Sequence, residues 1–154
     1  EADKIVTELD REFFDLKKKV GSKPRPTVAL VIWRTQGSLQ DMYVVGGKGV
    51  HQEVLEAIGG MNVFADLSTA FPRIAKESLV ARNPEIIIDA LPSHTEENRQ
   101  QSLKLWRRLR PLQAVREGRV YPLNFAELTI PGPRIGEVAG RLFEVIHGEP
   151  KSGE

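Results

Sequence analysis

The 154-residue chain has no cysteine, which excludes disulfide bonds, thiol nucleophiles and cysteine-ligated metal sites. It also lacks a long apolar run: the longest, residues 28–33, is far shorter than the roughly 20 residues that span a bilayer. Neither sign of charge is in excess, because 22 basic residues balance 21 acidic ones to a net charge of +1. So small a net charge produces no strong field toward nucleic acid or an anionic membrane, and we expect no nucleic acid as a partner.

Signatures of catalysis are equally scarce. The sequence contains no G-x-S-x-G elbow for a nucleophilic serine. Its three histidines, His51, His94 and His147, are scattered, and none has a second ligand at metal-binding spacing. We therefore expect a protein that binds rather than catalyses, with no cofactor or metal of its own.

One glycine-rich turn leaves an enzymatic alternative open. Gly46, Gly47 and Gly49 follow a predicted strand and precede a predicted helix, a position where backbone amides can bind anions. The turn matches neither the G-x-x-x-x-G-K-[ST] loop nor G-x-G-x-x-G, because Gln52 takes the place of the third glycine. A tight turn into the helix is the favoured interpretation. The alternative is a stand-alone nucleotide- or cofactor-binding enzyme domain that uses this turn.

Hydrophobic patterns predict helices and strands that alternate along the chain. Apolar residues at steps of three and four predict an amphipathic helix over residues 1–22, which Gly21 ends. Continuous apolar runs at residues 27–33 and 85–90 predict strands that are buried on both faces. Such alternation predicts an α/β fold, a three-layer Rossmann-like lobe with a mostly parallel sheet and right-handed crossovers.

The pattern divides the chain into three parts. The long helix of residues 1–22 precedes a lobe over residues 23–148, and a polar tail at residues 149–154 is expected to be frayed. In open α/β sheets, ligands bind at the carboxyl ends of the strands. The segments to inspect are those that follow each predicted strand: Arg34, residues 46–48, residues 92–94 and residues 124–129.

Several segments, in order along the chain, carry a recognisable pattern: residues 43–47, 55–63 with its Gly-Gly-x-Asn turn, 74–79, 83–88, 114–123 with Trp106, and the Pro-Gly-Pro-Arg at 131–134. Together they resemble the C-terminal lobe of periplasmic binding proteins that deliver iron-siderophores, haem or cobalamin to ABC importers. The resemblance covers most of the chain and implies a binding function. The N-terminal helix resembles the helix that joins the two lobes in that family, which implies a signal peptide and an N-terminal lobe before Glu1.

The resemblance also implies roles for particular residues. Glu77 matches a glutamate that docks on the membrane permease, although an acidic residue there also favours its own helix N-terminus. Phe71 falls where cobalamin-type members carry an aromatic that contacts the ligand, and packing is its alternative role. The predicted ligand contacts are Phe71, Trp33 and Arg34 at the end of the first buried strand, and, on position alone, His94 and Glu127.

The chain departs from the family's pattern at Ile130, where many members carry an arginine. An anion contact from that position is therefore absent, which counts against a highly charged siderophore. The expected ligand is a metal chelate or corrinoid that itself carries iron or cobalt, and the expected location is periplasmic, or extracytoplasmic and lipid-anchored. With its partner lobe and ligand removed, the lobe is expected to expose apolar surface and to self-associate.

Overall fold

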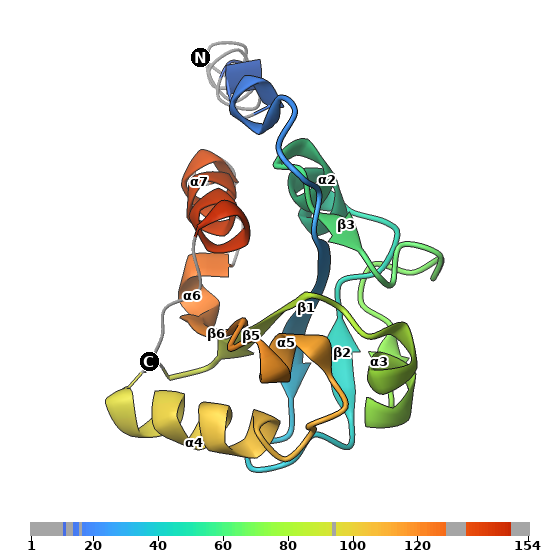
Figure 1. Ribbon diagram of the computed structural model, residues 1–154, viewed down its shortest axis with the longest axis vertical. Coiled ribbons are helices and arrows are strands. Elements are labelled where there is room, and N and C mark those ends of the chain that lie inside the picture. Colours follow the sequence, from blue (N-terminus) through green and yellow to red (C-terminus); the bar gives the residue numbers. More distant parts are fainter. Residues whose placement is uncertain (1–10, 12–13, 16, 94, 129–134, 149–154) are drawn as a thin grey trace.

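The computed structural model describes residues 11, 14–15, 17–93, 95–128 and 135–148. Six strands form one sheet, and helices α2 to α7 surround it (Figure 1). The strands are β1 (Thr27–Arg34), β2 (Met42–Val44), β3 (Met61–Asn62), β4 (Arg73–Ile74), β5 (Ile86–Leu91) and β6 (Val120–Asn124). The helices are α2 (Val50–Ala57), α3 (Lys76–Arg82), α4 (Glu96–Trp106), α5 (Gln113–Arg116), α6 (Phe125–Leu128) and α7 (Ile135–His147).

The sheet has the order β4-β2-β1-β5-β6, and β3 pairs with β1. The pairs β1/β3, β1/β5 and β5/β6 are parallel, which confirms the predicted α/β class and the mostly parallel sheet. The strand β2 is the exception, because it runs antiparallel to both β1 and β4. Residues 35–41 are too few for a crossover, so β1 and β2 form a hairpin.

Two apolar cores cover the two faces of the sheet, as a strand buried on both sides requires. Along β1, Val28 and Leu30 pack into one core, and Ala29 and Val31 into the other. The first core also takes in α2 and α7, and the second α3, α4 and α5, so the lobe has three layers (Figure 1). Every residue of β5 is buried, which explains its nearly unbroken apolar sequence.

Local signals place most element ends correctly. The sequence offers Ser93 or Thr95 as the cap of a helix from Glu96 to about Leu109, and the structure shows Thr95, whose side chain accepts from the backbone N–H of Asn98 (3.1 Å). The helix ends earlier than this pattern predicts, at Trp106, and Pro111 follows. Since a residue before proline disfavours helical backbone, the chain turns there and resumes as the short α5.

The N-terminal helix is described only in part. Residues 11, 14–15 and 17–20 are helical, and the remainder of the predicted helix 1–22 before residue 17 lies outside the described residues. Gly21 has φ +44°, and its N–H bonds the carbonyl of Lys17 (3.2 Å), so it ends the helix as predicted. The tail at residues 149–154 lies outside the described residues, and the division of the chain into three parts stays a prediction.

Candidate functional site

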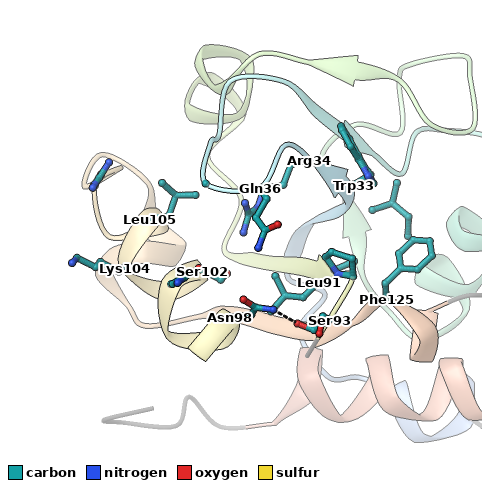
Figure 2. Close-up of a pocket in the computed structure, with 16 residues that line it drawn as sticks. Trp33, Arg34, Gln36, Leu91, Ser93, Asn98, Ser102, Lys104, Leu105 and Phe125 are labelled. Atoms are coloured by element: carbon teal, nitrogen blue, oxygen red, sulfur yellow. Dashed lines mark hydrogen bonds between the residues drawn. The ribbon is translucent and has the colours of Figure 1, made fainter. Parts of the chain in front are cut away.

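A cavity of about 500 Å³ lies at the carboxyl ends of β1 and β5, one of the places where the sequence predicted a ligand. The loop after β1 and one side of α4 form two of its walls, and Phe125 of α6 contributes from the far side (Figure 2). Both β1 and β5 belong to the centre of the sheet, so the cavity floor is rigid. This volume falls in the range of small-molecule sites.

One end of the cavity is aromatic and apolar. Trp33 is 50% exposed and stacks edge-to-face on Tyr43, with the ring centroids 5.7 Å apart. Phe125, which is 38% exposed, and Leu91 lie near Trp33 in this end (Figure 2). Half-exposed aromatic rings around a cavity offer flat apolar contact at low entropic cost, so this end suits a planar apolar ligand group.

Arg34 lines the cavity, but its guanidinium already has a buried partner. Its Nε and Nη2 donate to the carboxylate of Asp89, with the shortest contact 2.8 Å from Nη2 to Oδ2. The exposed fractions of the two side chains are 8% and 0%. Ser102 Oγ (2.6 Å) and Trp106 Nε1 (3.0 Å) donate to the same Oδ2. A ligand contact by Arg34 stays a prediction. What the structure shows is that Arg34 pairs with the buried carboxylate of Asp89.

The sequence interpretation did not identify the Asp89 cluster. Asp89 accepts hydrogen bonds from the end of β1 and from two turns of α4, so one carboxylate fixes two cavity walls relative to each other. A signal was present in the sequence: Asp89 is the one charged residue in the buried run of β5. Because a buried charge needs partners, an acid in such a strand predicts a polar cluster.

In the glycine turn, the backbone N–H groups of Gly46 and Gly47 are already hydrogen-bonded and are not available to a phosphate. The N–H of Gly46 donates to the carbonyl of Ala70, and that of Gly47 to the carbonyl of Leu67, each at 2.8 Å. A Cβ on Gly47 would lie 2.0 Å from the carbonyl oxygen of Ala65. These glycines allow a close approach of the 65–72 loop, so a tight turn, rather than an anion cradle, accounts for them.

Asn62, in the Gly-Gly-x-Asn segment, hydrogen-bonds to the backbone of the same turn. Its Nδ2 donates to the carbonyls of Val45 (2.8 Å) and Gly46 (3.1 Å) and to Oε1 of Gln52 (2.9 Å). Its Oδ1 accepts from the N–H of Phe64 (3.0 Å). One buried amide thus ties β3, the glycine turn and α2 together, which gives that part of the resemblance a structural explanation.

Phe71 lies away from the cavity, beyond the glycine turn. Its ring is 44% exposed and packs edge-to-face on His51, with centroids 5.5 Å apart. His51 in turn uses Nε2 to bond the carbonyl of Leu128 (2.8 Å). Phe71 and Val50 are both exposed near this turn, so apolar surface extends beyond the cavity itself.

The structure gives less information on the remaining predicted residues, Glu77, His94 and Glu127. Glu77 is exposed in the first turn of α3, and it forms no ion pair within the part of the chain that the structure describes. His94 lies outside the described residues. Glu127 belongs to α6, but its side chain is not among those described.

The pKa shifts in the lobe belong to surface ion pairs that do not line the cavity. The hydrogen bond from Arg82 lowers the pKa of Asp66, and the same bond raises the pKa of Arg82. Arg82 also donates to the carbonyl of Val63 (2.6 Å). The hydrogen bond to Asp41 raises the pKa of Arg73. None of these four side chains lines the cavity, so the shifted pKa values have no bearing on a ligand there.

The described residues contain no group of three or more His, Asp or Glu side chains that could hold a metal ion. Within the same residues, no helix is both long and apolar enough to cross a bilayer. A cavity with aromatic walls at the carboxyl edge of a Rossmann-like sheet is typical of ligand-binding proteins.

The chain belongs to the periplasmic binding protein family, whose model matches residues 1–126. This membership confirms the resemblance found in the sequence and the expectation of a binding protein rather than an enzyme. It also counts against the nucleotide-binding enzyme alternative, in agreement with the engaged amides of the glycine turn.

Three similar proteins illustrate how much of a relative this chain covers. A vitamin B12-binding protein of Vibrio parahaemolyticus is 26% identical over 132 residues, which are 85% of this chain and 44% of that protein. An ABC transporter substrate-binding protein of Listeria monocytogenes superposes with a TM-score of 0.81 at 20% identity, covering 94% of this chain and 56% of that one. A periplasmic heme-binding protein of Pseudomonas aeruginosa superposes with a TM-score of 0.75 at 24% identity, covering 97% of this chain and 54% of that one. The structural likenesses show the fold alone, and the chain spans about half the length of these proteins.

Proposed function

We propose that this chain is the C-terminal half of the substrate-binding component of an ABC importer for an iron chelate or cobalamin. The observation that carries the proposal is the aromatic-walled cavity at the carboxyl edge of the sheet in a member of the periplasmic binding protein family. A second lobe, encoded before Glu1, would close over this edge and hold the ligand between the lobes. The chain's coverage of only about half of its relatives supports this arrangement.

Location and assembly follow from the same proposal. The whole protein would act outside the cytoplasmic membrane, free in the periplasm or held by a lipid anchor. Without the second lobe, the exposed rings of Trp33, Phe71 and Phe125 leave apolar surface at the carboxyl edge of the sheet and near the glycine turn. Such a surface favours self-association of the isolated lobe.

Reading the gene upstream of the codon for Glu1 tests the two-lobe arrangement directly. A continuous reading frame that encodes a signal peptide and a second α/β lobe would support it. A start codon immediately before Glu1 would contradict it, because the cavity would then have only the walls that this lobe supplies.

Truncating an aromatic wall should weaken ligand binding. The whole gene product is titrated with haem, a ferric trihydroxamate and cyanocobalamin, and the bound ligand should raise the melting temperature. Trp33→Ala removes a wall of the cavity, and Phe71→Ala removes an exposed ring beside the glycine turn that would contact the ligand between the two lobes. Each is expected to weaken binding of the active ligand about tenfold, as loss of a buried aromatic contact does. Met61→Ala is the matched control, because Met61 is 53% exposed but lies on β3, and neither the cavity nor the ring pair of Phe71 and His51 includes it. Equal affinity in all three variants would contradict the assignment of these aromatics.

Glu77 is proposed to dock on positively charged side chains of the permease. In proteoliposomes that contain the permease and its ATPase, Glu77→Ala should raise about fivefold the binding-protein concentration needed for half-maximal ATPase stimulation. Ligand affinity should not change. Glu53→Ala is the matched control, because Glu53 is also exposed in the first turn of a helix and loses the same helix-dipole interaction. Equal effects of the two variants would leave Glu77 with a helix-stabilising role only.

A further inference from the structure

The polar end of the cavity carries cations that no acidic side chain balances. The ionisable residues that line it are Arg34, Lys104 and Arg108, and no Asp or Glu is among the described residues of the lining. Arg34 is neutralised by Asp89, which is buried behind the wall. Lys104 and Arg108 are exposed and form no ion pair within the described part of the chain, so no carboxylate offsets their charges beside the cavity.

The two cations flank the C-terminal end of α4. Lys104 lies in its last turn, one turn after Gln101, and Arg108 lies in the turn that follows the helix, where its N–H donates to the carbonyl of Leu105 (3.3 Å). The opposite side of the helix is buried through Leu103 and Trp106. In Figure 2, Lys104 lies at one end of the pocket, while Trp33 and Phe125 lie at the other. The cavity therefore changes along its length from aromatic to amide-rich and cationic.

A simpler role for cations near a helix C-terminus is to offset the macrodipole. Arg107, the C-cap residue, meets that need as well as its neighbours do, but it does not line the cavity. Arg107 and Arg110 are exposed, lie close in sequence to Arg108 and do not line the cavity, so they separate a helix-dipole or general surface effect from an effect of the cavity.

We propose that Lys104 and Arg108 form an anion-binding subsite, so that the cavity prefers a flat apolar group bearing a carboxylate over the same group without charge. This inference rests on the proposed ligand-binding function and narrows its ligand class to anionic amphiphiles. Since both side chains are exposed, the preference is moderate and is screened by salt.

A matched pair of small probes tests the subsite on the 154-residue chain. 2-Naphthoate and 2-naphthamide have nearly the same shape and differ in charge, and either is small enough for the cavity. Titration followed by NMR should give a dissociation constant about fivefold to tenfold lower for the carboxylate at low salt. The indole N–H of Trp33 should shift with both probes. At 1 M salt the difference should nearly vanish.

Variants locate the effect. Lys104→Gln/Arg108→Gln should abolish the preference for the carboxylate and leave the binding of naphthamide unchanged. Arg107→Gln/Arg110→Gln removes the same net charge outside the cavity and should keep the preference. Equal affinities of the two probes for the wild-type chain, binding of neither at millimolar concentration, or equal losses in both double variants would overturn the subsite. The proposed importer function is tested separately, by the titration of the whole gene product with haem, a ferric trihydroxamate and cyanocobalamin.

Discussion

Arg34→Met is expected to lower the free energy of unfolding by about 3–5 kcal/mol, the usual cost of removing one partner from a buried ion pair. The reason is the environment of Asp89, whose side chain has no exposed surface and would lose the guanidinium that pairs with it. The bonds from Ser102 and Trp106 would remain, but neither group is charged. Urea denaturation of both proteins measures the difference.

Two further variants make this prediction specific. Arg34→Met/Asp89→Asn should lose less than the sum of the two single variants, because the double variant buries no lone charge and keeps an acceptor for Ser102 and Trp106. Arg73→Met breaks an ion pair with Asp41 in which both side chains are more than half exposed, and it should change stability little. A loss in Arg34→Met as small as that in Arg73→Met would show that the buried pair contributes little to folding.

Gly47→Ala should destabilise the lobe by about 3 kcal/mol or more, at the upper end of what overpacking costs. The added Cβ would lie 2.0 Å from the carbonyl oxygen of Ala65 and 2.9 Å from that of Leu67. These are backbone atoms, so no side-chain rotation relieves the contact. The 65–72 loop must move, and it carries Phe71, so the variant should also weaken ligand binding.

Gly140→Ala is the natural comparison for that variant. Gly140 lies inside α7, and a Cβ there would meet no atom within 4 Å. Replacing it should raise the free energy of unfolding by about 0.5–1 kcal/mol, because alanine favours helix and restricts the unfolded chain. Thermal denaturation followed by circular dichroism measures both variants. If Gly47→Ala proved as stable as the wild type, the close packing of the glycine turn against the loop would be wrong.

Much of the fold is predictable from local sequence. The apolar runs of β1 and β5 are nearly continuous because both faces of these strands are buried. The elements missed were short: β4 has two residues, and α5 and α6 have four each, too few for periodicity to show. The direction of β2 depends on the length of the hairpin loop rather than on the pattern of the strand itself.

The candidate site was predictable only in position. Trp33, Pro92 and Ser93, which the sequence analysis selected because they follow strands, do line the cavity, while their contact with a ligand stays a prediction. The partner of Arg34 was not predictable from the sequence. Asp89 is 55 positions away, and the two side chains meet only because β1 and β5 lie side by side. The same holds for Lys104 and Arg108, whose place beside the cavity depends on how α4 packs against the sheet. A sequence pattern carries local preferences, whereas side-chain partners across a sheet are set by tertiary packing.

The hairpin between β1 and β2 makes this lobe suitable as an optical reporter. Its loop, residues 35–41, leaves the sheet at the cavity, and Gln36 is both exposed and part of the cavity lining. The chain has no cysteine, so Gln36→Cys would create a single thiol for attachment of a fluorescent dye. The dye would stand at the rim, where an arriving ligand displaces water, and the central strands would be undisturbed.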